Sequence, residues 1–513
     1  MGDRCGTDHG NRYDPTGPVF ISYRQSDGTE LAKCLDRFLR AGGLVPWRDL
    51  VDLPPGETAR RVHEAFEEGI AAAVLIVTPE IQQSQFVPAE ELPELLKLEQ
   101  EPHDFSLLVL NTIPKQDETA SNDGRSQGDG VDAGQPSTDD APADHPLGGC
   151  GRSDEAIDVK APGRLLKTTG QPLKKLKQYG LGECRQLYRD LLHRRLGHLM
   201  RPAERYLPIG LPTGVVAAIS SALGWLFGDG EVTIQTQTRP IPDAHTRRSG
   251  TTRLGREHDL AIRLRQDPDT GIPAVEDYRH LKETLPIMVD ALYAHGVSGV
   301  TLTGGGHFSL GWALGTALPI TRQGGLRVID LQGNEWTDAS RSDDQKTFHA
   351  VAGSFAEHTP QDPSLQEADR LHRVAVLIRN QNGQNQQLFD ELKATCDESF
   401  EIVIEGSGDH FYPSNEGARL ATEIANELRK RGAGRELHIA WSTATSLAPL
   451  VARRTNTLNC VLYELTQNPL VARQRYQKVL RVAAGMPHGP IVEVFDKVAR
   501  PSKTTRVEGE TRD

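Results

Sequence analysis

The sequence predicts an α/β protein in which strands and helices alternate along most of the chain. Three observations carry this prediction. Residues 17–110 have the pattern of a doubly wound unit, and two further series of strands and helices occupy about 230–345 and 370–500. The two later series also contain one pair of segments with weak sequence similarity to each other. Such alternation is typical of parallel sheets covered by helices on both faces.

The N-terminal unit begins with a β-rich run at 18–23. Apolar residues then recur with helical spacing between positions 31 and 39, and Gly42 and Gly43 end this predicted helix. A short apolar strand follows, and after it a helix that ends at Gly69. The remaining elements are a central strand at 71–77, a Glu-rich helix from about Pro88 and a strand at 105–110.

Residues 115–155 interrupt this unit. The segment has no aromatic residue and carries ten acidic against three basic residues, so it cannot bury enough apolar surface to order itself. We expect the missing helix beyond it, at 184–199. The predicted first domain is therefore 17–203 with a disordered insertion at 115–160, followed by a connecting segment at 204–229.

The C-terminal part, 230–500, is predicted to contain two similar α/β halves. The first has strands at 232–237, 259–264, 297–302 and 326–331 and a long helix at 275–294. The second has strands at 374–378, 400–404 and 437–441 and a helix at 415–431. Segments 299–314 and 436–451 both consist of a strand, a small polar turn, Ser-Leu and an apolar helix, which indicates a duplication. Residues 501–513 are expected to be a disordered tail.

Composition excludes several classes of protein. The net charge of −12 argues against a general DNA or RNA binder, which needs a broad basic surface. The six cysteines are scattered without a Cys-x-x-Cys pair, so we expect neither a zinc site nor a disulfide framework, and a reducing cytoplasm is the simplest location. The longest uncharged run, 207–228, is broken by Pro and Gly, which favours a buried helix with loops over a membrane span.

Four motifs of the N-terminal unit resemble those of TIR domains. Residues 19–24 resemble the first strand of that family, and 47–56 resemble its second strand and the loop after it. Residues 71–79 resemble the third strand with its terminal Thr-Pro. Residues 84–90 match the Ser-x-Trp-Val-x-x-Glu pattern of TIR enzymes, with Phe86 in place of Trp. The resemblance implies a flavodoxin-like doubly wound domain.

Some TIR domains cleave NAD⁺ between nicotinamide and ribose, whereas others are adaptors. The resemblance implies that Glu90 is the catalytic glutamate, with Glu91 as the alternate if the pattern slips by one residue. A fixed carboxylate stabilises the positive charge that develops on the ribose, and no metal or other cofactor is needed. The implied substrate-binding residues are Ser22, Tyr23, Arg24, Asp49 and Phe86. From the residues alone, the acids could equally form a solvated helix face, Phe86 could hold its helix to the sheet, and Asp49 could cap its loop.

The C-terminal part resembles a SAVED domain, a fusion of two CARF-like halves that senses cyclic oligonucleotides in anti-phage signalling. The residues that carry this resemblance are 303–309 and 437–446. It implies that the ligand is bound by residues of the two turns, namely Gly305, Gly306, His307, Phe308, Ser309, Ser442, Thr443, Thr445 and Ser446. Glycines at a strand end let the backbone approach a phosphate, and the next helix offers N–H donors. The alternative is a pair of tight turns with capping serines, and Arg453 and Arg454 are further candidate phosphate partners.

Together these resemblances predict an NAD⁺ hydrolase of abortive-infection defence that is activated by a cyclic tri- or tetranucleotide. Binding is expected to drive self-association into an oligomer or filament, with no role for DNA or a membrane. The alternative is a non-enzymatic sensor whose TIR domain recruits a partner.

Overall fold

The computed structural model describes seventeen stretches of the chain: 13–48, 65–84, 87–101, 104–115, 156–167, 172–200, 230–238, 258–320, 324–338, 348–358, 371–381, 386–406, 414–455, 457–466, 475–483, 485–486 and 488–496. Asp49, Phe86, the connecting segment 204–229 and the tail 501–513 lie outside these residues, as does most of the predicted insertion.

The first sheet contains five parallel strands. They are β1 (Val19–Ser22), β2 (Pro46–Arg48), β3 (Ala72–Val77), β4 (Leu107–Asn111) and β5 (Gln178–Tyr179). Their order is β2-β1-β3-β4-β5, which is the order of flavodoxin-like doubly wound sheets. The two-residue β5 was not predicted from the sequence.

Helices cover both faces of this sheet. The helices α1 (Gln25–Ala41) and α6 (Cys184–Leu199) pack on one face, where their apolar residues share a core with alternate residues of β1, β3 and β4. On the other face lie a π-helical turn, η2 (Val87–Glu91), and α3 (Leu92–Gln100), together with α4 (Ala161–Leu165) and α5 (Pro172–Lys175). The chain thus returns after residues 116–155 to complete the same sheet and its helical cover.

The second sheet has the order β10-β9-β8-β6-β7. Its elements are β6 (Glu231–Gln237), β7 (Leu260–Arg263), α8 (Val275–Ala294), β8 (Gly299–Gly305), α9 (Phe308–Ala317), β9 (Leu326–Ile329) and β10 (Glu335–Thr337). All neighbouring strands are parallel except β10, which is antiparallel to β9.

The third sheet has the order β11-β14-β13-β15-β16-β17-β18, with β12 also paired to β14. Its elements are β11 (Phe348–Ala352), β12 (Ala356–Glu357), β13 (Arg373–Asn380), α10 (Gln386–Lys393), β14 (Glu398–Gly406), α11 (Gly417–Gly432), β15 (Glu436–Ser442), α12 (Leu447–Ala452), β16 (Asn459–Leu465), β17 (Tyr476–Ala483) and β18 (Ile491–Val494). β11 and β12 come from 348–357, between the two halves predicted from the sequence.

The second and third sheets repeat one topology. In the second sheet β6 lies between β7 and β8, and in the third sheet β13 lies between β14 and β15. The parallel strands β6, β7, β8 and β9 therefore correspond in order and direction to β13, β14, β15 and β16. The similar segments 299–314 and 436–451 therefore correspond to β8–α9 and β15–α12. The two equivalent helices pack against each other so closely that a Cβ on Gly315 would lie 2.3 Å from the carbonyl oxygen of Pro449.

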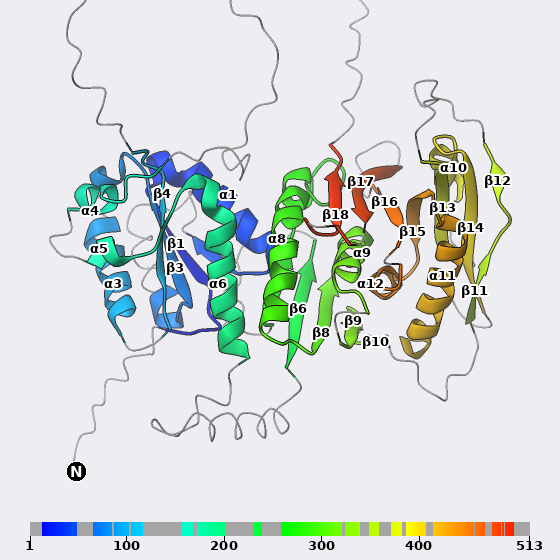
Figure 1. Ribbon diagram of the computed structural model, residues 1–513, viewed down its shortest axis with the longest axis horizontal. Helices are drawn as coiled ribbons and strands as arrows, with labels where there is room; N and C mark the ends of the chain where they lie inside the picture. The colour runs from blue at the N-terminus through cyan, green and yellow to red at the C-terminus, as the bar shows by residue number, and fades with distance from the viewer. Residues whose placement is uncertain are drawn as a thin grey trace, which may run out of the picture.

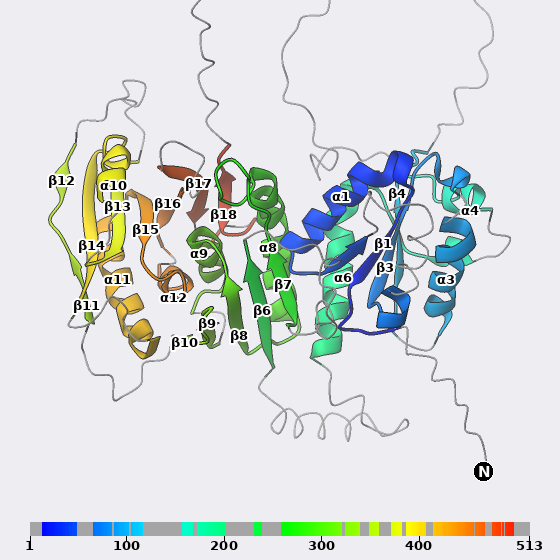
Figure 2. The ribbon, with the colours of Figure 1, turned by 180° about the vertical axis from the view of Figure 1, so that it is seen from behind.

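The three sheets lie side by side along the long axis of the molecule (Figures 1 and 2). Helices α1 and α6 of the first domain pack on α8, and α9 and α12 lie between the second and third sheets. One hydrophobic cluster continues across all three units. In the ranges that the structure describes, no helix is long and apolar enough to cross a membrane.

Candidate functional site

The first candidate site lies where β1 separates β2 from β3. In open α/β sheets, ligands bind at the carboxyl ends of strands where the strand order reverses. Ser22 is the last residue of β1 and pairs with Leu75 of β3 at this point. Its hydroxyl donates a hydrogen bond to Glu91 Oε2 at 2.5 Å, and the two residues are only 1% and 5% exposed. The fold thus fixes a buried carboxylate at the switch point of the first sheet.

The structure distinguishes the two glutamates that the sequence left open. Glu91 ends the π-helical turn and points inward, whereas Glu90 is exposed to solvent. Successive side chains on a helix diverge by about 100°, so only one of two adjacent residues can face the sheet. The sequence holds a signal for this difference, because Glu91 follows Val87 and precedes Leu95 at intervals of four along the buried stripe.

The other predicted substrate-binding residues have different positions. Tyr23 is buried in the core beneath α1, away from the Ser22–Glu91 edge. Arg24 donates hydrogen bonds to the carbonyl and carboxylate of Glu80, at 2.5 and 2.8 Å, which fixes it to the loop after β3. Asp27, which sequence reasoning missed, accepts hydrogen bonds from Thr78 Oγ1 and from the Glu80 amide in the same loop. Asp49 and Phe86 lie outside the described residues.

A second candidate site begins at the switch point between β6 and β8. There the Thr238 hydroxyl lies 2.7 Å from His307 Nδ1 and accepts a hydrogen bond from the His307 amide at 3.1 Å. Because the Thr238 oxygen already accepts from the His307 amide, we assign its hydroxyl proton as the donor to Nδ1. The imidazole proton of His307 is then on Nε2. Nε2 is buried and has no hydrogen-bond partner within the described part of the chain. His307 thus holds an unused N–H group at the end of β8.

The equivalent switch point of the third sheet, between β13 and β15, contacts the β6–β8 switch point through two stacked aromatic rings. Thr443 donates a hydrogen bond to Asn380 Oδ1 at 2.5 Å, in the place that Thr238 and His307 occupy in the first half. Trp441, near the end of β15, stacks on Phe308 of α9 with ring centroids 5.8 Å apart. Both rings are buried, so Phe308 packs in the core and does not offer a face for a base, which corrects the sequence-based expectation.

The amino end of α9 is also already occupied. The Ser309 amide donates a hydrogen bond to Glu464 Oε1 at 2.8 Å, and its hydroxyl lies 2.6 Å from the Tyr278 hydroxyl. The expectation that Ser309 offers an N–H donor to a phosphate is therefore wrong, because a buried carboxylate from β16 fills that position. Glu464 lies 155 positions further along the chain, too far for a local motif to reveal it.

Six predicted ligand residues remain at least partly accessible around these turns. They are Gly305, Gly306, Ser442, Thr443, Thr445 and Ser446. Arg453 and Arg454 are not among the neighbours of this surface. Arg453 is buried in an ion pair with Asp338 at 2.7 Å, and Arg454 donates to carbonyl oxygens of Leu450 and Asp338, which corrects their assignment as phosphate partners.

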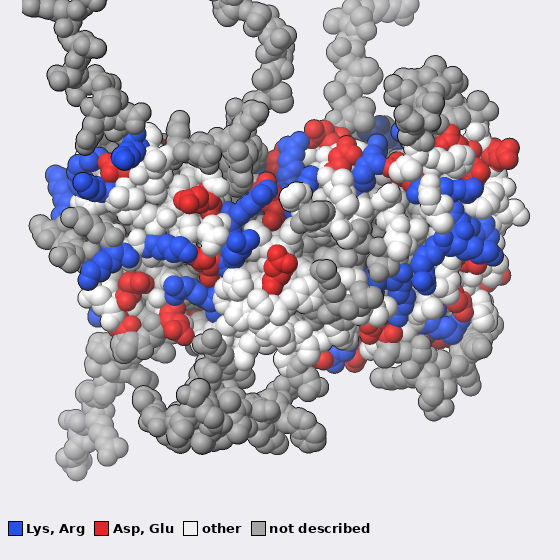
Figure 3. All heavy atoms as spheres, in the orientation of Figure 1, with Lys and Arg blue, Asp and Glu red and all other residues white. Residues whose placement is uncertain are grey.

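Charged side chains of both signs are interspersed over much of the face in Figure 3, and Lys and Arg gather where α11 lies. On α11 these include Arg419, Arg429, Lys430 and Arg431. Arg419 pairs with Glu423 and Arg431 with Glu427, so part of this positive charge is compensated locally.

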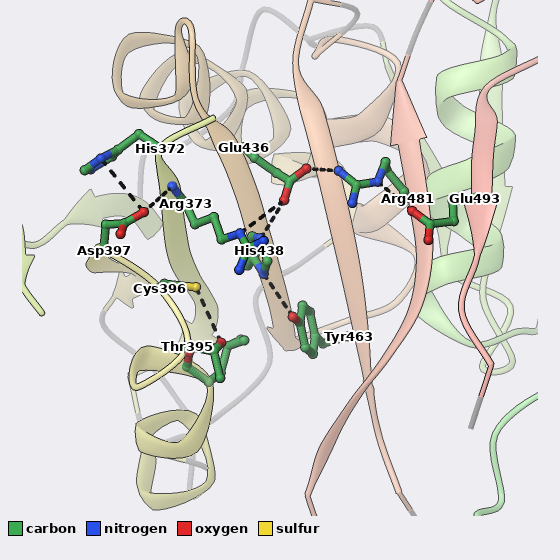
Figure 4. Close-up of polar contacts among 11 residues, drawn as sticks. His372, Arg373, Thr395, Cys396, Asp397, Glu436, His438, Tyr463, Arg481 and Glu493 are labelled. Atoms are coloured by element: carbon green, nitrogen blue, oxygen red, sulfur yellow. Dashed lines mark hydrogen bonds and ion pairs between the residues drawn. The ribbon is translucent and has the colours of Figure 1, made fainter. Parts of the chain in front are cut away.

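A separate polar network occupies the opposite ends of the strands in the third sheet (Figure 4). His438 is bracketed by Glu436 Oε1 and the Tyr463 hydroxyl, each 2.9 Å from a ring nitrogen. Glu436 also accepts a hydrogen bond from Arg481. Burial lowers the pKa of His438 well below its ordinary value of 6.5, and the positive charge of Arg373 adds to this effect. Burial therefore keeps His438 neutral, with its two ring nitrogens satisfied by Glu436 and Tyr463.

No protein-family model matches the chain, and no curated protein is similar to it in sequence. Among solved structures it is similar to the Cap4 SAVED/CARF-domain containing receptor of Acinetobacter baumannii, in complexes with the cyclic trinucleotides 2'3'3'-cAAA and 3'3'3'-cAAA. The sequence identities to these two structures are 11% and 10%, and the TM-scores are 0.37 and 0.36. Each match covers 77% of this chain and 85% of the receptor. The Cap4 receptor of Moraxella osloensis matches 80% of this chain and 86% of its own, with 10% identity and a TM-score of 0.32. At such TM-scores the correspondence of single residues is undefined, so the two sites rest on the geometry of this chain.

Proposed function

We propose that the chain is a cyclic-oligonucleotide-activated NAD⁺ hydrolase in which Glu91 is the catalytic carboxylate. The observation that carries this proposal is the Ser22–Glu91 hydrogen bond at the switch point of a flavodoxin-like sheet. The motif at 84–90 that resembles TIR enzymes ends at the neighbouring Glu90, so the choice of Glu91 rests on its burial and its bond to Ser22.

The chemistry needs only a fixed negative charge and a water molecule. The bond between ribose C1′ and the nicotinamide nitrogen breaks, and its electron pair leaves with nicotinamide. Water adds to C1′ and releases a proton, giving ADP-ribose. Positive charge builds on the ribose during this step, and a carboxylate at this place stabilises that charge once the ligand has opened the buried Ser22–Glu91 pair to the substrate.

The regulatory ligand in this proposal is a cyclic tri- or tetranucleotide bound over the turns after β8 and β15. Two observations support it. The two turns are equivalent in a duplicated fold, and a ring of repeated nucleotides can present the same groups to both. His307 Nε2 is a buried donor without a partner in the described part of the chain, and in this proposal the ligand opens the turn so that Nε2–H reaches a phosphate oxygen or a base nitrogen. Activation through self-association into an oligomer or filament, in defence against phage, is part of the same proposal.

One observation favours the non-enzymatic alternative. Ser22 and Glu91 are almost completely buried, so this conformation does not present the carboxylate to a substrate. A sensor that only recruits a partner would need no such access. An enzyme would need the ligand to open or complete the site.

The experiment that separates these functions is NAD⁺ cleavage by the purified chain alone. A panel of cyclic di-, tri- and tetranucleotides, including 2'3'3'-cAAA and 3'3'3'-cAAA, would be added to wild type, Glu91→Gln and Glu90→Gln. We expect cleavage with one ligand in wild type and Glu90→Gln and its loss in Glu91→Gln. Tight binding of a ligand with no cleavage in any protein would contradict the enzyme and leave the sensor.

A further inference from the structure

An ionic cluster around a buried carboxylate joins the first domain to the second sheet, although the Arg265 side chain in it is 45% exposed. Asp36 of α1 is 1% exposed. Arg40 Nε donates a hydrogen bond that both carboxylate oxygens of Asp36 share, each at 3.0 Å. It also lies 3.9 Å from Arg48 Nε, at the end of β2, and 3.6 Å from Arg265 Nη2, just after β7. One carboxylate is thus shared by arginines from three separate elements.

The first turn of α8 connects this cluster to the second candidate site. Asp277 accepts a hydrogen bond from the Arg265 amide at 2.5 Å, and burial raises the pKa of Asp277 to about 6. The next residue, Tyr278, points to the other side, where its hydroxyl contacts Ser309 Oγ. Ser309 is the second residue of α9, directly after the turn that carries His307. Two adjacent residues of one helix therefore contact the first turn of α9 and the backbone of Arg265, whose guanidinium lies in the ionic cluster.

The cluster is incompletely satisfied, which would let it adopt a second arrangement. Arg37 Nε, Arg48 Nη1 and Asp277 Oδ1 are buried without a hydrogen-bond partner among the residues that the structure describes. Asp36 holds neither Arg48 nor Arg265 at hydrogen-bond distance. A shift of about 1 Å would bring Arg48, whose side chain is 10% exposed, to full contact, and Coulomb's law makes such a change worth on the order of tenfold in an equilibrium, whereas contact by the more exposed Arg265 is worth less.

We propose that the first turn of α8 is a positioning element that links the nucleotide-binding turn to β2 through Asp277, Arg265 and Asp36. Arg48 pairs with Ile21 in the sheet, one residue before Ser22, so a change at Arg48 acts directly beside the first candidate site. This inference rests on the proposed function for the identity of the ligand. It adds a route within one chain by which binding in the second sheet alters the first.

The test uses full-length Tyr278→Phe and Asp36→Asn, with Tyr463→Phe as the matched control. Tyr463→Phe also removes a buried hydroxyl contact, to His438, but away from α8. Three measurements are made on each protein: affinity for 3'3'3'-cAAA and for the rest of the panel by calorimetry, ligand-induced change in hydrogen exchange over residues 36–48, and NAD⁺ cleavage. We expect Tyr278→Phe to keep its affinity within about threefold. Its exchange response and its activation should fall about tenfold, as should those of Asp36→Asn, whereas the control should match wild type.

The outcomes separate this link from the proposed function. If a nucleotide binds and alters exchange over 36–48 in wild type but not in the variants, the link holds even when no NAD⁺ is cleaved. If NAD⁺ cleavage is activated equally in Tyr278→Phe, Asp36→Asn and wild type, the link is wrong and the enzyme stands. If no nucleotide in the panel binds, both are overturned.

Discussion

Replacing Glu91 with Gln is the sharpest perturbation of the first site. Glutamine keeps the size of the side chain and an oxygen that accepts the Ser22 hydrogen bond, but it removes the negative charge. Any loss of activity would therefore report the charge and not the packing. Glu90→Gln is the matched control, because it makes the same chemical change one position away on the exposed face.

The size of the effect follows from the electrostatics of the site. A carboxylate about 4 Å from the developing positive charge, at an effective dielectric constant of about 20, stabilises it by about 4 kcal/mol. Each 1.36 kcal/mol corresponds to about tenfold in rate, so Glu91→Gln should lower kcat by about 10³. Glu90→Gln should stay within about twofold of wild type, because an exposed charge is screened by water.

The assay is release of nicotinamide from NAD⁺ at saturating cyclic nucleotide, with thermal unfolding to verify that each variant is folded. The reasoning would be refuted if Glu90→Gln abolished cleavage while Glu91→Gln kept it. It would also be refuted if both variants were as active as wild type.

Three further changes test other parts of the structure. His307→Phe removes the unused Nε2–H group together with the Nδ1 contact to Thr238, so the affinity for the activating nucleotide should fall about tenfold by calorimetry; an unchanged affinity would place the ligand elsewhere. The lowered pKa of His438 means that below pH 6.5 the unfolded chain binds a proton that the folded chain does not, so stability should fall as the pH drops, by about 1.4 kcal/mol per unit from this group. Denaturant titrations should show a flatter pH dependence for His438→Gln, and parallel curves would contradict this assignment. Gly315→Ala should destabilise the protein by about 1–3 kcal/mol, because the new Cβ would collide with Pro449. The control Gly163→Ala should not destabilise it, because there is open space around Gly163. Equal melting temperatures of the two variants would contradict the close packing of α9 and α12.

Much of the fold could be predicted where the sequence pattern is long and regular. The helices at 184–199 and 275–294 were predicted with the bounds that the structure shows. Their apolar residues repeat over four or more turns, so local pattern and tertiary packing agree. The two-residue β5 is too short to produce a pattern, and β11 and β12 lie in a segment that was not assigned to either half.

The sites depend on contacts that no local pattern contains. Ser309 meets Glu464, and Thr238 meets His307, only because the sheets bring distant strand ends together. Glu90 and Glu91 are neighbours in the π-helical turn before α3, and the geometry of that turn decides which of the two side chains faces the sheet. Sequence motifs could therefore indicate the neighbourhood of each site but not which side chain faces it.

The most direct test of the account is ligand-dependent NAD⁺ cleavage by the purified chain with no other protein present. The account predicts no cleavage without nucleotide, cleavage with one cyclic tri- or tetranucleotide, and a loss of about 10³ in Glu91→Gln. Cleavage that needs no nucleotide, or a nucleotide that binds tightly and leaves NAD⁺ intact, would contradict it.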